Sequence, residues 1–190
     1  MPPKTKITKE MIVDAAFQIA RTQGAENINA RRVAEMLHCS TQPVMYHFAT
    51  IQDLKHATYI KADAFHSAYI NNVSGDSENI LLEIGLLYIR FATIEKHLFR
   101  FLFQSNEFSD KSLMEIIQGE ELAPVLDIMQ QAMELTLGET KEIFISLFLL
   151  VHGYASMLAN NNMIYDEKTI IIQLKRALIG SLIALKEEIK

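Results

Sequence analysis

The chain has 190 residues, of which 49% are apolar and 22% are charged, a composition typical of a soluble globular protein with enough material for a core. Its four prolines and seven glycines are too few for a fold built from many short strands and turns. A net charge of −5 excludes a uniformly basic surface, and the single Cys39 excludes an intrachain disulfide and fits a reducing cytoplasm.

The charge is distributed unevenly along the chain. Residues 1–60 hold seven basic and five acidic side chains, whereas the remainder holds 11 basic and 18 acidic ones. A mildly basic end on an acidic body is typical of a protein that touches a polyanion at that end alone.

Residues 1–7 predict a short arm before the first helix. The arm lacks the apolar core of a signal peptide. Arms of this kind are usually frayed termini, but Lys4 and Lys6 could also reach a phosphate backbone.

Residues 9–23 predict an amphipathic helix, because apolar side chains recur at helical spacing from Ile12 to Ile19. Thr8 is a candidate N-cap, since its hydroxyl can accept a hydrogen bond from an otherwise unsatisfied backbone N–H. Gly24 is suited to the position that follows the last helical residue. The apolar face of this helix needs a partner, and the next two helices supply one.

Residues 30–48 predict two short helices joined by a tight turn. Asn29 is a candidate N-cap of the first helix and Ser40 of the second. Val44 and Phe48 lie four residues apart and would anchor the second helix. This is the general shape of a helix-turn-helix, although an ordinary corner between two helices of an all-helical protein has the same pattern. The side chains left facing outward would be Thr41, Gln42, Tyr46 and His47.

A long helix is predicted next. Thr50 and Asp53 have the spacing of a capping box, and the helical pattern then continues to about Asn72. About 20 residues at 1.5 Å each span ~30 Å. Such a helix could link a small N-terminal unit to the rest of the protein.

The remaining sequence predicts further helices and no convincing strand. The apolar run 143–159 is too short and too mixed for a membrane span, and we interpret it as a buried helix. A break is expected near Gly119, with a fresh start at Pro124 and an end at Gly138. The expected helices are residues 78–95, 98–104, 112–137, 140–160 and 167–187. The predicted fold class is therefore all-α, with about nine helices.

Residues 8–55 resemble the DNA-binding domain of the TetR (tetracycline repressor-like) transcriptional regulators. As a set the matching motifs are fairly specific, and they cover about a quarter of the chain. The resemblance implies an N-terminal helix-turn-helix DNA-binding domain at residues 1–56 and a C-terminal helical effector-binding and dimerisation domain at residues 57–190. The matching residues are Ile12-x-x-Ala15-Ala16, Gly24, Ile28-Asn29-x-x-Arg32-Val33-Ala34, Tyr46-His47-Phe48 and Asp53-Leu54.

The resemblance also implies a function. It implies a cytoplasmic, ligand-responsive repressor that binds a palindromic operator as a homodimer and is released by a small-molecule effector. Ligand binding would move the long helix and change the spacing of the two reading heads. Such a protein is not an enzyme, and neither a cofactor nor a metal is expected.

Carried over by position, the resemblance implies which side chains meet DNA. Arg31 and the start of the second short helix would face bases, and Tyr46 and His47 would lie against the phosphate backbone. We expect Gln42 to read adenine, because its amide can pair with both groups of the adenine edge. The full predicted set is Arg31, Ser40, Thr41, Gln42, Pro43, Tyr46, His47 and Lys55.

Three positions depart from the family pattern. His38 replaces the usual turn glycine and would be strained if its φ were positive. Met45 and Ile51 replace a common tyrosine and a common lysine, so two polar contacts to the backbone are missing. We expect Lys55, Lys6 and the N-terminus of the long helix to substitute, and we expect a weak salt dependence of binding for the family.

The C-terminal part suggests two further sets of residues, each of which could equally be ordinary helical core. An apolar or amphipathic effector would bind among Phe65, Phe91, Phe103, Met129 and His152. The dimer interface would be formed by the last two helices, at Leu150, Tyr154, Met157, Leu174, Leu178 and Ser181.

Two other classes of protein compete with a regulator. An enzyme is disfavoured, because the only cysteine lies in the predicted turn and the six histidines show no HExxH spacing. His152, in an apolar helix, is more often a hydrogen-bonded core histidine than a catalyst or ligand. The alternative function is a helical protein-interaction module without DNA binding, which a DNA-binding assay would distinguish.

Overall fold

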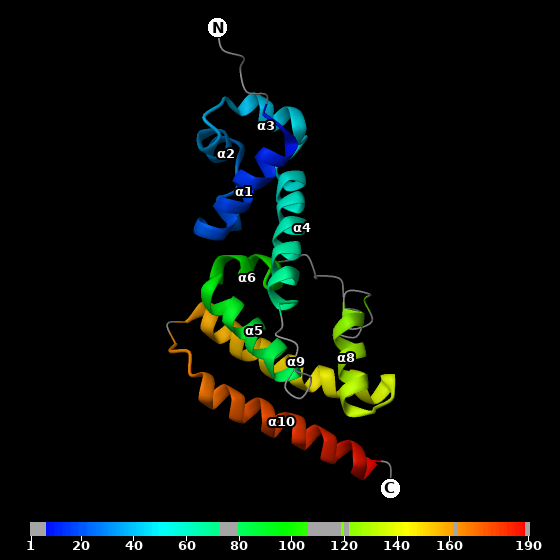
Figure 1. Ribbon diagram of the computed structural model, residues 1–190. Coiled ribbons are helices and arrows are strands. Elements are labelled where there is room, and N and C mark those ends of the chain that lie inside the picture. The colour runs from blue at the N-terminus through cyan, green and yellow to red at the C-terminus, as the bar shows by residue number, and fades with distance from the viewer. Residues whose placement is uncertain (1–6, 73–79, 106–118, 120–121, 162, 189–190) are drawn as a thin grey trace. The chain divides into compact units, whose positions relative to one another are not determined.

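The computed structural model describes residues 7–72, 80–105, 119, 122–161 and 163–188. Within these ranges the chain forms nine α-helices, one short 3-10 helix and no strand, which confirms the all-α prediction (Figure 1). The elements are α1 (Lys9–Gln23), η1 (Ala25–Asn27), α2 (Ala30–Met36), α3 (Thr41–His47), α4 (Ile51–Ile70), α5 (Ile80–Ile94), α6 (Lys96–Phe103), α8 (Ala123–Met133), α9 (Leu137–Asn160) and α10 (Glu167–Glu188).

The helix ends follow local capping chemistry. The Thr8 hydroxyl accepts a hydrogen bond from the Met11 N–H at 3.2 Å, so α1 begins where predicted. Gly24 ends α1 with a φ of 97°, a backbone conformation that other residues rarely adopt. Thr50 and Asp53 form the predicted capping box at the start of α4.

The predicted end at Gly138 is wrong. α8 ends at Met133, where Glu134 adopts the left-handed conformation with a φ of 54°. Gly138 instead lies in the first turn of α9, because Thr136 and Glu139 form a capping box that starts this helix at Leu137. The fresh start at Pro124 is confirmed, since that proline lies in the first turn of α8. Of the break expected near Gly119, residue 119 itself is described and lies in a bend. The expected helix over 112–118 lies outside the described residues.

The chain divides into two compact units. The N-terminal unit contains α1, η1, α2, α3, α4 and α6, and the C-terminal unit contains α5, α8, α9 and α10. The structural boundary therefore does not fall at residue 56, because all of α4 up to Tyr69 and the later helix α6 belong to the N-terminal unit. The functional division at residue 56 stays a prediction.

The N-terminal unit is built on the apolar face of α1. Ile12 and Ile19 on this face are 0% and 1% exposed, and Val33 of α2 and Val44 of α3 are both fully buried. Removing side chains as large as isoleucine from such a core costs about 2–5 kcal/mol. The first three helices therefore hold one another in place, as the sequence predicted.

An ion pair inside the N-terminal unit joins α1 to the start of α6. The Arg21 guanidinium donates to the Glu95 carboxylate from Nε at 2.9 and 3.1 Å, and its Cζ lies 5.1 Å from the Phe65 ring centre. These hydrogen bonds hold the pKa of Arg21 above its usual value. Glu95 is buried and is also the residue that separates α5 from α6.

The C-terminal unit is centred on α9, which packs against α5, α8 and α10. Gly85 of α5 lies where the helices approach closely, since a Cβ there would stand 3.4 Å from both Val151 and Leu174. Arg90 of α5 donates to Glu167 at the start of α10 at 2.7 Å, and the Tyr165 hydroxyl donates to the same carboxylate. These hydrogen bonds lower the pKa of Glu167.

α9 is also the helix, among those described, that is long and apolar enough to cross a membrane. Core helices of soluble proteins pass the same test, so this property is weak evidence for a membrane span. The prediction of a buried helix is only partly right. Val151, Ala155 and Leu158 are buried, whereas Leu149 and Met157 are about half exposed, at 54% and 49%.

Candidate nucleic-acid interface

The turn between α2 and α3 is closed by backbone hydrogen bonds. The Cys39 N–H donates to the Ala34 carbonyl at 2.9 Å, and the His38 N–H donates to the Glu35 carbonyl at 3.2 Å. His38 has a φ of 51°, so the residue that replaces the usual glycine does adopt the left-handed conformation. For a residue with a Cβ this conformation costs about 1–2 kcal/mol. The conformation of His38 therefore lowers the free energy of unfolding.

α3 has one buried side and one exposed side. Val44 is fully buried and Phe48, directly after the helix, is 4% exposed. Thr41 and Gln42 are exposed, and Tyr46 is 83% exposed. Ser40 occupies the N-cap position, but its side chain makes no capping hydrogen bond, contrary to the expected cap chemistry. Together these residues present a polar surface on a helix whose inner side is anchored.

His47 does not face outward like its neighbours. It is half-buried, and its Nε2 lies 3.2 Å from the backbone carbonyl oxygen of Ile7. Its ring also stands edge-on to Tyr46 at 5.2 Å. The periodicity of α3 could not reveal this bond, because the two residues are 40 positions apart.

The cations of this surface lie outside α3, which contains neither lysine nor arginine. Arg31 is exposed and pairs with Glu35 one turn further along α2 at 3.0 Å. An exposed pair of this kind is worth only about 0.3–0.5 kcal/mol, so Arg31 can leave it for another anion. Arg32 is held by hydrogen bonds to Gln23 and Asn27.

Three more positions complete the surface. Pro43 is half-buried in the first turn of α3, and Lys55 is half-buried in α4. Met45 stands at the position where the TetR family commonly has tyrosine. Its side chain is 44% exposed, so this position presents an apolar surface to solvent. The predicted DNA-contacting residues thus all lie on α2, α3, the turn between them and the first turns of α4.

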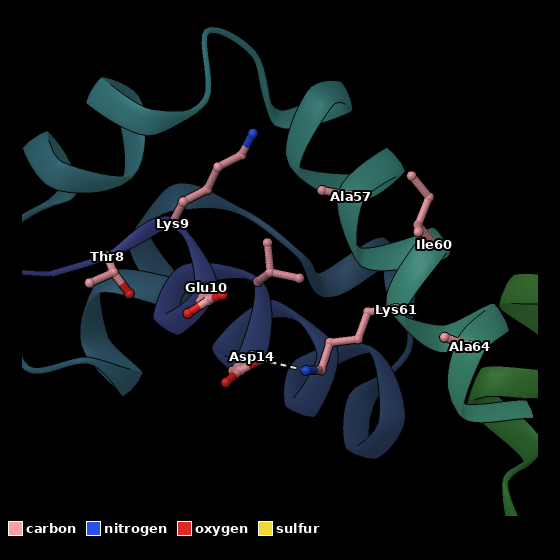
Figure 2. A pocket seen from close by; sticks show the side chains of 9 residues that line it. Thr8, Lys9, Glu10, Asp14, Ala57, Ile60, Lys61 and Ala64 are labelled. Carbon is pink, nitrogen blue, oxygen red and sulfur yellow. Dashed lines mark ion pairs between the residues drawn. The ribbon is translucent and has the colours of Figure 1, made fainter. Parts of the chain in front are cut away.

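A shallow hollow of about 620 Å³ lies between α1 and α4 (Figure 2). Val13, Ala57 and Ile60 are the larger part of its apolar lining, and Ala64 is the rest. An ion pair between Asp14 and Lys61 at 2.6 Å crosses from one helix to the other. No sequence pattern predicted this hollow, and none of the predicted effector residues line it.

The predicted effector residues are divided between the two units. Phe65 and Phe103 belong to the N-terminal unit, where Phe65 stands edge-on to Phe17 at 5.5 Å and Phe103 edge-on to His66 at 5.0 Å. The other three, Phe91, Met129 and His152, belong to the C-terminal unit. Phe91 and Met129 are almost fully buried there.

His152 belongs to an aromatic cluster that was not predicted from the sequence. Phe144, Phe148 and His152 repeat every four residues on α9 and stack at 5.7 and 5.5 Å between ring centres. The Tyr88 hydroxyl of α5 lies 2.9 Å from His152 Nδ1. Burial raises the pKa of Tyr88 and lowers that of His152, so at neutral pH a protonated phenol donates to a neutral imidazole. The spacing of four was readable in the sequence, but the partner on α5 was not.

The predicted dimer residues are also divided. Leu174 is 6% exposed and contacts its own chain, so this position is not available to a partner. Met157 is exposed, whereas Leu150, Tyr154, Leu178 and Ser181 are half-buried. The large exposed apolar side chains of the last two helices are Leu137, Leu149, Met157, Ile172, Ile179 and Ile183. A Cβ added at Gly153 of α9 or Gly180 of α10 would meet no other atom within 4 Å.

No group of three side chains suited to hold a metal ion occurs among the described residues.

Solved structures with the same fold as this chain are known, although its sequence matches little. No protein-family model and no curated protein matches the sequence. The crystal structure of the multidrug binding protein EbrR, complexed with imidazole, superposes with a TM-score of 0.61 at 17% identity, over 89% of this chain and 88% of that one. A TetR-family member from Streptomyces coelicolor superposes with a TM-score of 0.62 at 16% identity, over 89% of this chain and 96% of that one. The chain therefore has a TetR-like fold, which confirms the fold that the resemblance of residues 8–55 implies.

Proposed function

We propose that this protein is a transcriptional regulator that binds operator DNA as a homodimer and is released from it by a small-molecule effector. The observation that carries the proposal is the surface of α3, where Thr41, Gln42 and Tyr46 are exposed on a helix anchored by Val44. A helix held in this way can enter the major groove of DNA with its polar side toward the base edges.

The side chains divide between base reading and phosphate binding. Gln42 can pair with adenine, and Arg31 can turn from its weak pair with Glu35 toward a base or a phosphate. Ser40 and Tyr46 can donate hydroxyl hydrogen bonds to phosphates, and the Lys55 ammonium can pair with a phosphate. The Thr41 hydroxyl, at the start of α3, can donate to a base edge. The exposed Met45 adds apolar contact in place of a polar one.

The homodimer brings two such surfaces to the two halves of a palindromic site. Its interface would be the exposed apolar strip of α9 and α10 around Leu149, Met157, Ile179 and Ile183, which replaces the predicted position Leu174. Exposure of such an apolar strip to water is energetically unfavourable. The small residue Gly153 in it would let the helices of two protomers approach closely. The effector would control DNA binding if it binds better to the dimer conformation in which the two α3 surfaces do not fit the operator.

The likeness to a multidrug binding protein that was crystallised with imidazole supports a small-molecule effector. We propose that it is apolar or amphipathic, because the side chains offered to it are aromatic. We place it in the C-terminal unit, where aromatic side chains gather around Tyr88, Phe148 and His152. We infer that the protein is a cytoplasmic repressor. Bound to the operator it would block transcription, and its release by the effector would relieve that block.

A mobility-shift assay with the DNA that flanks the protein's own gene tests the proposal, with selection from random duplexes as a second source of operator. We expect saturable, sequence-selective binding. If no duplex binds more tightly than bulk DNA, the DNA-binding function is wrong and the protein-interaction module becomes the better interpretation. The exposed apolar strip on α9 and α10 is the feature that would then carry the interaction.

A further inference from the structure

α3 lacks the charged side chains that read G·C base pairs. Its seven residues include neither arginine nor lysine, which pair with the two acceptors of guanine, and neither aspartate nor glutamate, which accept from cytosine. The basic residue of α3 is His47, and its Nε2 already lies 3.2 Å from the carbonyl oxygen of Ile7. The helix proposed to enter the major groove is therefore poorly equipped to select G·C pairs.

The exposed side of α3 offers chemistry that suits A·T pairs instead. The amide of the exposed Gln42 has a donor and an acceptor, which match N7 and the N6 amino group of adenine. Met45 is 44% exposed, and its unbranched apolar chain can lie against the C5 methyl group of thymine. The exposed Thr41 adds a methyl group and a hydroxyl. In the major groove, the adenine edge and the thymine methyl are features of A·T pairs alone.

These side chains form one continuous patch on the helix. Met45 follows Gln42 by three positions and Thr41 by four, so each is its neighbour on the helix surface, with Cβ atoms about 5–6 Å apart. Val44 is fully buried and fixes which side α3 presents. Since consecutive base pairs are stacked about 3.4 Å apart, the distance from Gln42 to Met45 corresponds to between one and two base-pair steps.

The arginines of the helix-turn-helix lie outside α3. Arg31 belongs to α2, where it pairs with Glu35. Arg32, also of α2, is held by Gln23 and Asn27. Because the first helix of a helix-turn-helix crosses the DNA backbone, a guanine contact by Arg31 would fall beside the base pairs that α3 covers and not among them.

We propose that each half of the operator presents A·T pairs to α3, with an adenine read by Gln42 and, about one or two base pairs away, a thymine whose methyl group contacts Met45. Met45 is then a specificity-determining residue, and its replacement of the common tyrosine does more than remove a polar contact. The inference rests on the proposed function, because it names the class of operator sequence that the proposed regulator binds.

The first experiment selects duplexes from a random pool, once with the wild-type protein and once with Gln42→Arg. Because arginine reads guanine, one A·T pair in each half-site should become G·C in the second selection, which locates α3 on the site. We expect a conserved A·T pair within about two steps of that position. If no base changes in the Gln42→Arg selection, or if the neighbouring positions are conserved as G·C, the inference is overturned.

The second experiment removes single methyl groups from the DNA and leaves the protein unchanged. In the selected duplex, 2′-deoxyuridine replaces one thymine at a time in both half-sites, and fluorescence anisotropy gives the affinity of the wild-type protein. Burial of one methyl group corresponds to about a fourfold change in an equilibrium constant, so we expect a loss of about 15-fold for the two half-sites together. If no thymine near the adenine is sensitive, Met45 does not contact a methyl group.

The third experiment assigns this sensitivity to Met45. In Met45→Ala the affinity for the thymine duplex should fall, and deoxyuridine should cause no further loss, because the methyl group has no partner left. The matched control is Met36→Ala, which truncates a methionine of α2 that is 42% exposed, and it should keep the wild-type sensitivity. Full sensitivity in Met45→Ala would contradict the role of Met45.

The fourth experiment tests the adenine contact. 7-Deaza-2′-deoxyadenosine lacks the N7 acceptor and keeps the base pair, so it should weaken wild-type binding about 2- to 12-fold per half-site at the adenine that Gln42 reads. Gln42→Ala should be indifferent to this replacement. Equal losses in the wild type and in Gln42→Ala would show that Gln42 does not read adenine.

The two nucleotide replacements are made in the DNA, so they test the inference even where a protein variant unfolds. Thermal unfolding by circular dichroism accompanies each variant. The proposed function and this inference can fail separately. If the wild-type protein enriches no duplex, the proposed function fails. If it enriches duplexes in which neither replacement changes the affinity, the regulator stands and only the inference about A·T pairs fails.

Discussion

His66 should make the N-terminal unit sensitive to mild acid. It lies in α4 with its ring edge-on to Phe103 of α6, and burial lowers its pKa to about 4, because the charged imidazolium is poorly solvated there. In the unfolded chain its pKa is about 6.5. Between these two values the unfolded state binds a proton that the folded state excludes, so stability is complete above pH 6.5 and falls as the pH drops toward 4.

The magnitude follows from the two pKa values. At pH 5 the unfolded histidine is almost fully protonated and the folded one almost fully neutral, which lowers the free energy of unfolding by about 2 kcal/mol relative to pH 7.5. His66→Leu removes this contribution. The variant should therefore lose about 2 kcal/mol less than the wild type between pH 7.5 and pH 5, whatever other groups titrate in both proteins.

Urea unfolding followed by circular dichroism at the two pH values measures this difference. His56→Leu is the matched control, because it removes an exposed imidazole from the same helix. If His66→Leu and the wild type lose the same free energy on acidification, the imidazole is not held neutral by burial and the reasoning is refuted.

Three further predictions concern the reading head and the dimer. Gln42→Ala should lose about 1–3 kcal/mol of discrimination at one base pair in a binding-site selection, with Gln131→Ala as control, and an unchanged operator preference would show that another residue reads that base. His38→Gly should raise the free energy of unfolding by up to about 1–2 kcal/mol, because glycine accepts the φ of 51° without strain, and a loss of stability would contradict this account of the turn. Ile179→Glu should convert the dimer into a 21.6 kDa monomer in sedimentation at micromolar concentration, whereas the control Ile60→Glu should stay dimeric. If the wild-type protein itself sediments as a monomer, the proposed homodimer is wrong.

The local features of this protein were readable from its sequence. The bounds of α1, the capping by Thr8 and Asn29 and the anchoring of α3 by Val44 all depend on residues within about four positions of one another. The start of α9 differs from the prediction although its signal is equally local, because the capping box of Thr136 and Glu139 starts the helix before the glycine at position 138.

Contacts between distant residues were decided only by the tertiary structure. The stripe on α10 contains Leu174, which packs inside its own chain, and the exposed Ile179 lies only five residues further along. Periodicity identifies an apolar stripe, but which part of it meets the same chain depends on how α5 and α9 pack on α10. The same limit applies to the bond from His47 to Ile7 and to the pair of Arg21 with Glu95, 74 residues away.

By itself, then, the sequence determined the all-helical fold class, the ends of most helices and the helix-turn-helix, because these follow from spacing and capping within a few residues. The tertiary structure decided that α6 belongs to the N-terminal unit, that His47 faces the chain and that the exposed apolar strip of the last two helices includes Ile179 rather than Leu174. Burial is a property of the packed chain, and no local pattern specifies which of two equally apolar side chains is covered.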